Sequence, residues 1–280
     1  MRIAILILLA APAWCDVESK RTVEKALPLA AGGTLHVCGF NGSVRVEPGN
    51  GAEVRFTVHE KLKGDSQSDL DELKREIDVV ITGDAQHVRA GVKGPWSDGV
   101  CGAETKRKSN WSGRDKHFSH EFLVQAPRDA RLEISSINGS LDIKDMRGDY
   151  KIRTVNGSIK LHDVEGSGDM ATVNGSVTAV FRNNPRNDTM LKTVNGKLAL
   201  YLQPTLNADF SMKTVNGDAF TDFDMTPIGV SGSSETKAGN KIVYKRGSGV
   251  HMRAGNGGPK ITVETVSGSV MLHSLAKGRP

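Results

Sequence analysis

One short segment, Thr-Val-Asn-Gly, recurs through the second half of the chain at nearly constant intervals. From Asn138 onward, the intervals between the asparagines of successive copies are 18, 18, 21 and 21 residues. Related segments, in which a glycine follows an asparagine or a serine, occur near residues 40 and 267. A fixed period of this kind is typical of architectures in which each unit stacks on its neighbour. The segment therefore predicts a repetitive fold rather than several copies of one binding site.

Apolar residues hold constant positions around each asparagine. The position four residues before it is always apolar, as is the position three residues after it; the position two residues before it is Ser or Thr. Because successive side chains of a strand point to opposite faces, the positions four and two residues before the asparagine share one face, and the apolar position after the turn continues it. We expect this face to point inward.

Two architectures fit this pattern. Each Asn-Gly could form the two-residue turn of a hairpin, which would pair Ile152 with Leu161. Alternatively, each unit is one coil of a parallel β-solenoid, and Asn-Gly marks the same corner in every coil. Near-identity at that corner favours the solenoid, because stacked asparagine side chains can hydrogen-bond in a ladder. The predicted ladder consists of Asn138, Asn156, Asn174, Asn195 and Asn216.

The repeat also resembles a known family. Apolar-x-Thr-x-Asn-Gly-x-apolar-x-apolar units, an Asn-Gly-Ser-Val-x-Val segment at 41–46 and a Val-x-Ala-Pro segment at 124–127 resemble the bacterial adhesin-like β-strand-repeat family of unknown function. The resemblance spans about residues 32–275. It implies a single exported or envelope-associated parallel β-solenoid, and it brings no established catalytic residues.

The first residues read as an export signal. Arg2 precedes an unbroken apolar run from Ile3 to Ala11, which is too short to cross a hydrocarbon layer of about 30 Å. We expect residues 1–15 to be removed, no transmembrane segment, and a periplasmic or extracellular protein associated with the cell envelope. A net charge of +5 is only a mild basic excess. It gives little support for nucleic acid as a partner, which would need a clustered basic face with aromatic stacking platforms.

Two cysteines, Cys38 and Cys101, remain after such cleavage. In an oxidising compartment they could form a disulfide, or they could stay as two free thiols. The sequence contains no zinc motif of the Cys-x-x-Cys type, and we expect no metal or other cofactor.

We expect a single elongated all-β domain over 16–280. Its irregular N-terminal part, 16–130, contains one short helix near 68–77, a capping-box pattern that begins at Ser68, and a long loop at 91–117 with two tryptophans and a basic cluster. Regular repeats follow at 131–223. An insertion and hairpin at 224–254 would pair 241–244 with 250–253, and a last coil occupies 255–275.

Candidate sites are few. The outward positions Val155, Val173 and Val194 stand immediately before repeat asparagines, and Arg153, Lys192 and Lys213 stand three residues before repeat asparagines. These side chains either suit exposed strands or bind an envelope component or an anionic glycan. His117 and His120 lack zinc-binding spacing, and we expect both at the surface. Four aspartates recur near turns without a constant offset: Asp142, Asp145, Asp163 and Asp169. The sequence therefore predicts a non-enzymatic, adhesin-like binding or scaffolding module; the alternative is a lyase or hydrolase that acts on polysaccharide from a β-helix scaffold.

Overall fold

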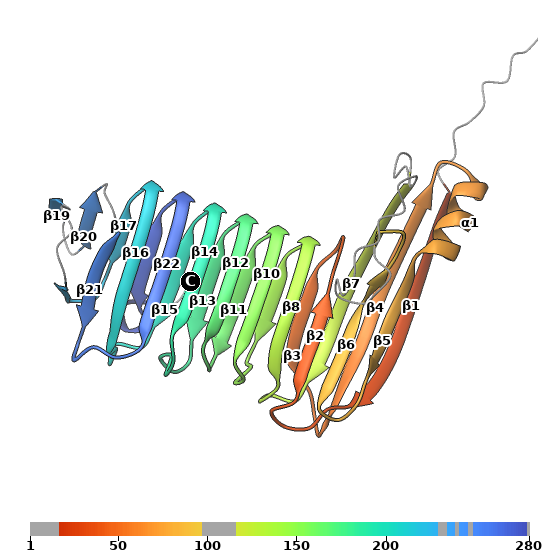
Figure 1. Cartoon of the computed structure of the whole chain (residues 1–280), viewed down its shortest axis with the longest axis horizontal. Coiled ribbons are helices and arrows are strands. Elements are labelled where there is room, and N and C mark those ends of the chain that lie inside the picture. Colours follow the sequence, from red (N-terminus) through yellow and green to blue (C-terminus); the bar gives the residue numbers. More distant parts are fainter. Residues whose placement is uncertain (1–16, 97–115, 229–233, 239–240, 246–248, 279–280) are drawn as a thin grey trace, which may run out of the picture.

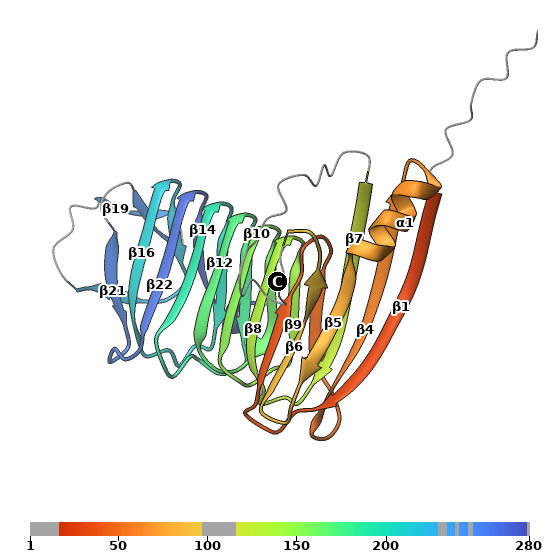
Figure 2. The ribbon, with the colours of Figure 1, turned by 45° about the vertical axis from the view of Figure 1, so that its right-hand side comes forward.

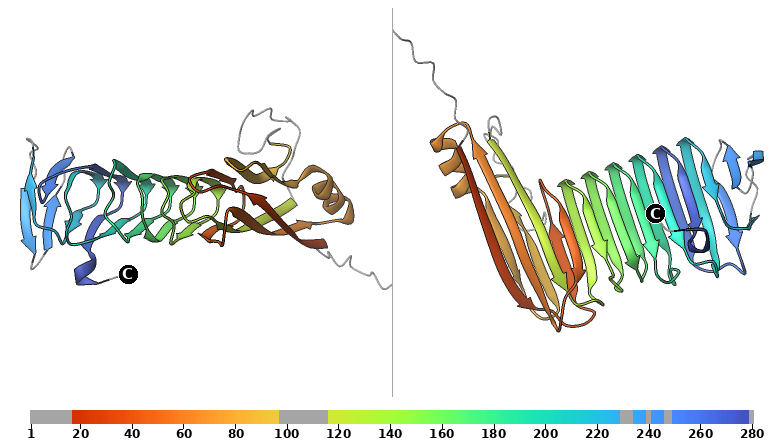
Figure 3. Two further views of the ribbon diagram at one scale, coloured as in Figure 1. Left: turned by 90° about the horizontal axis from the view of Figure 1, so that it is seen from below. Right: turned by 180° about the vertical axis from the view of Figure 1, so that it is seen from behind.

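The computed structural model describes residues 17–96, 116–228, 234–238, 241–245 and 249–278. Within these ranges the structure is all-β apart from one α-helix and a short 3-10 turn. Its strands form two mostly parallel sheets, which face each other along an elongated body (Figure 1). Seen from below, the sheets are two layers with a narrow space between them (Figure 3).

We call the larger sheet A and the smaller one sheet B. The order of the 12 strands across sheet A is β1 (Val17–Pro28), β4 (Glu53–Gly64), β7 (Lys116–Ala126), β3 (Val44–Pro48), β9 (Leu141–Lys144), β11 (Ile159–Val164), β13 (Val177–Phe181), β15 (Leu198–Leu202), β23 (Val270–Ser274), β17 (Ala219–Thr221), β20 (Lys241–Lys245) and β19 (Ser234–Ala238). The order of the 11 strands across sheet B is β18 (Met225–Pro227), β21 (Val250–Ala254), β16 (Ala208–Asn216), β22 (Lys260–Ser267), β14 (Thr189–Asn195), β12 (Gly168–Asn174), β10 (Tyr150–Asn156), β8 (Arg131–Asn138), β2 (Thr34–Cys38), β6 (His87–Lys93) and β5 (Asp78–Gly83).

Each repeat unit contributes one strand to sheet B and the next strand to sheet A. In sheet B, β10 runs parallel to β8 and β12, so Ile152 lies opposite Ile134 on one side and Met170 on the other. In sheet A, β11 pairs in the same way with β9 and β13. Ile152 and Leu161 therefore belong to different sheets, and the hairpin register that would pair them does not form. Successive units stack side by side along the body.

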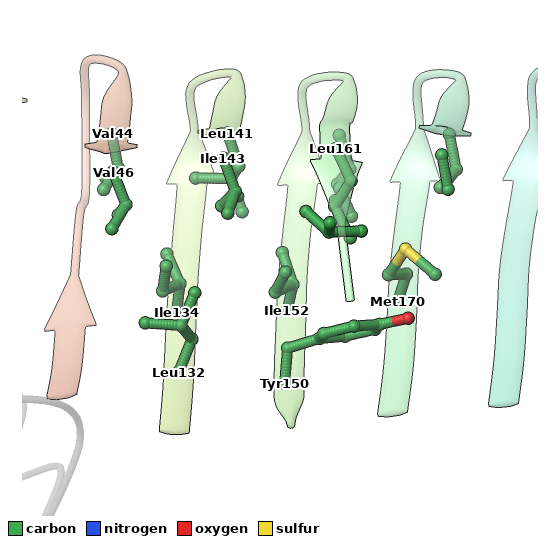
Figure 4. Close-up of a cluster of buried hydrophobic side chains, with 14 of the residues drawn as sticks. Val44, Val46, Leu132, Ile134, Leu141, Ile143, Tyr150, Ile152, Leu161 and Met170 are labelled. Carbon is green, nitrogen blue, oxygen red and sulfur yellow. The ribbon is translucent and has the colours of Figure 1, made fainter. Parts of the chain in front are cut away.

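The space between the sheets is filled by aliphatic side chains from every unit (Figure 4). Leu132, Ile134, Ile152, Leu161 and Met170 are each at most 1% exposed. Full burial of one such side chain contributes about 1.5–3 kcal/mol to folding. The repeated apolar positions therefore hold the two sheets together along the whole stack.

The corners carry a ladder of asparagine side chains. Nδ2 of each asparagine donates to Oδ1 of the asparagine in the preceding unit, at 2.8–2.9 Å, in the series Asn195, Asn174, Asn156, Asn138 and Asn41. Asn41 extends the series beyond the repeats predicted from the sequence. Asn216 does not continue it, because its neighbour in the sheet is Ser267 rather than Asn195. The prediction that Asn216 stacks on Asn195 is wrong.

Buried threonines and corner glycines bring neighbouring units together. Oγ1 of Thr172 donates to the carbonyl oxygen of Gly157 in the preceding unit at 2.9 Å, and the other units repeat this contact. A Cβ added to Gly157 would lie 2.1 Å from the carbonyl oxygen of Gly139. A side chain at this corner would therefore force the units apart, which explains why the corner residue is glycine.

The spatial order of the units differs from their order in the chain. The last unit, β22 and β23, lies between β14–β15 and β16–β17 (Figure 1). At the other end, β2 and β3 lie between β6–β7 and β8–β9. Antiparallel strands flank the outermost units: β4 and β5 at one end, β20 and β21 at the other. Both ends of the parallel stack are thus covered, which blunts the exposed edges on which another chain could pair.

Helix α1 (Gln67–Glu76) agrees with the short helix expected near 68–77. Oγ of Ser66 accepts a hydrogen bond from the N–H of Asp69, so the N-cap is Ser66 rather than Ser68. Leu70 and Leu73 are buried against the N-terminal strands. Figure 2 shows the helix beside β1 and β4 at the far end of the body.

Two other expectations were wrong. Strand β20 pairs with β17 and β19 in sheet A, whereas β21 pairs with β16 and β18 in sheet B, so they do not form a hairpin with each other. Alternation shows that both segments are strands but not which strands they pair with. The expected loop at 91–117 is also too long, since β6 continues to Lys93 and β7 begins at Lys116; residues 97–115 lie outside the described part.

Candidate binding face

The outer surface of sheet B carries a row of exposed aliphatic side chains. Thr154 is 4% exposed and points inward, so Val155, the next residue, points outward and is 40% exposed. The same alternation operates in each unit. The result is the apolar row, which consists, in spatial order, of Ile137, Val155, Val173, Val194, Val266 and Val215.

The apolar row is a distinctive feature of the surface. Among the residues that the structure describes, its six members are the large hydrophobic side chains that are exposed, with exposed fractions of 39% to 49%. Neighbouring strands lie about 4.8 Å apart, so the row extends over roughly 24 Å. Val266 falls into line with the others only because β22 inserts between β14 and β16. The last unit of the chain therefore completes the row.

The predicted cations do not form a positive stripe. Arg153 lies in register with Ser135 and Ala171, and neither neighbour is charged. Lys192 and Lys213 lie on either side of Glu264, and the Lys192 ammonium is 2.9 Å from the Glu264 carboxylate. The positions beside the apolar row therefore carry three cations interrupted by uncharged residues and one carboxylate, and they offer a polyanion no continuous positive stripe.

The recurring aspartates lie in separate places. Asp142 is 3.7 Å from Arg45, and Asp145 forms an ion pair with Arg182. Asp169 lines a shallow hollow of about 260 Å³ that also contains Asp149 and Asp188, which the sequence analysis did not identify. Oδ1 of Asp149 accepts from the N–H of Ser167, and Oδ1 of Asp188 accepts from the N–H of Lys260. These two carboxylates connect neighbouring units, which accounts for them structurally.

His120 is buried, contrary to the prediction that it lies at the surface. It alternates with Phe118 and Phe122 on the inward face of β7, and its Nε2 is 3.1 Å from Oε2 of Glu60. The guanidinium of Arg21 donates two hydrogen bonds of 3.0 Å to the same carboxylate. Strand alternation around His120 would have identified its inward direction, but nothing in the sequence shows that Glu60 and Arg21 lie beside it.

This buried cluster shifts two pKa values. Burial alone would raise the pKa of Glu60, but the hydrogen bonds with His120 and Arg21 outweigh burial and lower it. The pKa of Arg21 is raised, chiefly by its hydrogen bonds to Glu60. The carboxylate and guanidinium are therefore both charged, and their placement beneath the surface of the sheet indicates a structural role.

Trp96, in the segment expected to be a long loop, contacts the core. The Trp96 ring stacks on Phe40 and Phe118, with ring centroids 4.4 and 4.9 Å apart. Trp96 therefore packs against aromatic residues of the core. Cys38 is disulfide-bonded; Cys101, the predicted partner, lies outside the described residues, so this pairing remains a prediction.

Within the described ranges, the His, Cys, Asp and Glu side chains form no group of three or more that could hold a metal ion. In the same part of the chain, no helix has the length and apolar character needed to span a membrane.

No family model matches the chain, and no curated protein matches it. The chain aligns with two solved structures over most of its length. One is titled a "putative cell adhesion protein" from Clostridium sporogenes; the match covers 91% of this chain and all of that one, with a TM-score of 0.43 and 11% identity. The other, titled a "putative adhesin" from Bacteroides fragilis, matches over 91% of this chain and 98% of that one, with a TM-score of 0.32 and 6% identity.

Proposed function

We propose that the chain is a single, exported β-solenoid that binds another component of the cell envelope through its apolar row and catalyses no reaction. The observation that carries this proposal is that the exposed large hydrophobic side chains of the described residues all fall in that row. Single exposed hydrophobic residues are ordinary, whereas contiguous ones mark interaction surfaces. The leader-like residues 1–15 support export.

The solenoid part of the proposal is supported by the register of the sheets. Equivalent residues of neighbouring units lie opposite each other in parallel strands, and their asparagine side chains hydrogen-bond in series. Such stacking produces an extended, repetitive surface, which is how other repeat proteins contact their partners.

Strand propensity alone does not account for the apolar row. The positions two residues earlier on the same strands are equally outward, yet they carry Ser135, Arg153, Ala171, Lys192, Glu264 and Lys213. Threonine would satisfy the preference of strands for β-branched residues and remain polar, but the row contains only valine and isoleucine. This restriction to aliphatic residues supports a contact surface.

The interruption of the cations beside the row narrows the class of partner. Because Glu264 separates Lys192 from Lys213, an anionic glycan would meet a carboxylate in the middle of the cationic positions. We therefore propose a partner that presents an apolar strip, such as an envelope protein or a lipid-bearing component. The adhesin-like family that the repeats resemble agrees with a binding role.

A pull-down from native envelope fractions tests the proposal. Val155→Thr, Val173→Thr and Val194→Thr, combined in one chain, keep β-branching and volume but remove apolar surface, and should reduce retention of the partner at least tenfold. The matched control replaces the same three residues with isoleucine, which already occupies the equivalent position at residue 137, and should retain binding. Thermal unfolding must show that both variants fold. Undiminished binding by the threonine variant would contradict the proposal.

A further inference from the structure

The corners of the stack hold their asparagine and glycine residues through contacts with the next unit. The N–H of Gly196 donates to the carbonyl oxygen of Ser267 at 2.9 Å, and Nδ2 of Asn195 donates to Oδ1 of Asn174 at 2.9 Å. Gly139, Gly157 and Gly175 donate in the same way to the asparagine carbonyl of the following unit, each at 3.0 Å. Hydrogen bonds therefore hold both the asparagine side-chain amide and the glycine N–H of such a pair.

The corner at Asn216 and Gly217 is different, because its unit is the outermost parallel unit of the stack. Beyond β16 lies β21, which runs antiparallel to it. Within the described part of the chain, neither Nδ2 of Asn216 nor the N–H of Gly217 donates a hydrogen bond. Gly217 is also exposed, whereas Gly139, Gly157, Gly175, Gly196 and Gly268 are half-buried.

An Asn-Gly pair whose asparagine amide and glycine N–H donate no hydrogen bond can deamidate spontaneously. The backbone nitrogen of the glycine attacks Cγ of the asparagine, the new N–Cγ bond replaces the Cγ–Nδ2 bond, and ammonia leaves with the proton of the attacking N–H. Water then opens the succinimide to aspartate or isoaspartate, so the sequence consumes one water and releases one ammonia. The asparagine side chain must rotate toward the glycine nitrogen, and that nitrogen must give up its proton.

We propose that Asn216 is a deamidation site of the folded chain and that stacking protects the equivalent asparagines of the inner units. At Asn195, deamidation requires loss of the Asn195–Asn174 and Gly196–Ser267 hydrogen bonds, and at Asn216 it requires neither. Two hydrogen bonds of ordinary strength together slow a reaction more than about tenfold.

Local sequence cannot explain such a difference. Asn195 and Asn216 lie in the same tetrapeptide, Thr-Val-Asn-Gly, and a lysine precedes each copy. The folded chain therefore contains its own control. Deamidation would also place a carboxylate beside Val215, the most exposed member of the apolar row at 49%.

The test incubates the folded full-length chain at neutral pH and follows the two asparagines by peptide mass spectrometry and isoaspartyl methyltransferase labelling. Cleavage after Lys192 and Lys213 separates the two copies. We expect deamidation at Asn216 to be at least about tenfold faster than at Asn195, and the two rates to converge in the unfolded chain. A ratio that is the same in folded and unfolded chains, or a folded Asn216 as slow as Asn195, would overturn the proposal.

A second variant tests the protection mechanism directly. Ser267→Asn places an amide between Asn195 and Asn216, so Nδ2 of Asn216 gains an acceptor in the neighbouring strand of the sheet, β22. We expect this variant to slow deamidation at Asn216 while the rate at Asn174, within the existing ladder, stays unchanged. An unchanged rate at Asn216 in a variant that unfolds at the wild-type temperature or above would show that the ladder does not protect.

Discussion

The ammonium of Lys192 lies 2.9 Å from the carboxylate of Glu264, which belongs to the last strand of sheet B along the chain. Glu264 is also in register with Lys213 on its other side. If β14 and β16 were direct neighbours, Lys192 and Lys213 would lie side by side. The inserted unit therefore separates two like charges, which provides a physical reason for its place in the stack.

Replacement of Glu264 tests this reason. Glu264→Lys would align three lysines on adjacent strands, and we expect it to lower the free energy of unfolding by roughly 1 kcal/mol. The loss should shrink at high salt, because exposed charges are screened. Glu264→Gln, the matched control, removes the attraction without adding repulsion and should cost less than the lysine variant. Equal losses that do not depend on salt would contradict the electrostatic explanation.

The asparagine ladder predicts that position within the stack determines sensitivity to substitution. Asn174→Asp removes the amide that donates to Asn156 and directs a carboxylate oxygen at the Asn156 oxygen, so unfolding free energy should fall by about 1–3 kcal/mol. Asn216→Asp makes the same change where no ladder bond exists among the described residues, and it should change stability much less. Chemical denaturation measures both values. Similar losses at the two positions would argue against the ladder.

Close approach at the corners makes a different prediction for glycine. Gly157→Ala would bring a methyl group against the carbonyl of Gly139, at 2.1 Å before relaxation, and should destabilise the stack by about 1–3 kcal/mol or more. Gly51→Ala is the control: it meets no atom within 4 Å, but its φ of +82° carries a strain cost of roughly 1–2 kcal/mol. Structurally, only the Gly157 variant should disturb packing, which amide exchange in β10 and β12 would report.

Glu60 predicts a dependence of stability on pH. Because its pKa in the folded chain is lowered, the ionised carboxylate stabilises the fold above the ordinary glutamate value of about 4.3, and this contribution is lost as the pH falls through the folded pKa. Melting temperatures should therefore decline more steeply below about pH 4.3 in the wild type than in Glu60→Gln. Glu121→Gln, on the outward face of β7, should follow the wild type. Identical pH profiles for Glu60→Gln and wild type would contradict the assignment.

The repeat pattern predicted the local structure of each unit well. Alternation placed Thr154 inward and Val155 outward, and the constant corner placed Asn156 between Asn138 and Asn174. These features depend on the period of a strand and on identity between units, and both can be read from the residues themselves.

The order of the units could not be predicted in the same way. Every unit presents a similar inward face and corner, so the local pattern permits β16 to stack on β14 as readily as on β22. The hints in the sequence were the serine at 267, which departs from the asparagine series, and the glutamate at 264, where the equivalent positions 192 and 213 carry lysine. The buried contact between Glu60 and His120 was hidden for another reason, since it joins strands 60 residues apart.

Site-specific photo-crosslinking in the native envelope locates the surface that contacts the partner. A photoreactive amino acid replaces Val173 in the middle of the apolar row, and a matched chain carries it at Thr178, on the outer face of sheet A. If the apolar row is the binding surface, we expect a discrete crosslinked product from position 173 and none from position 178. Equal crosslinking from both positions, or crosslinking from position 178 alone, would contradict the claim that the apolar row is the binding surface.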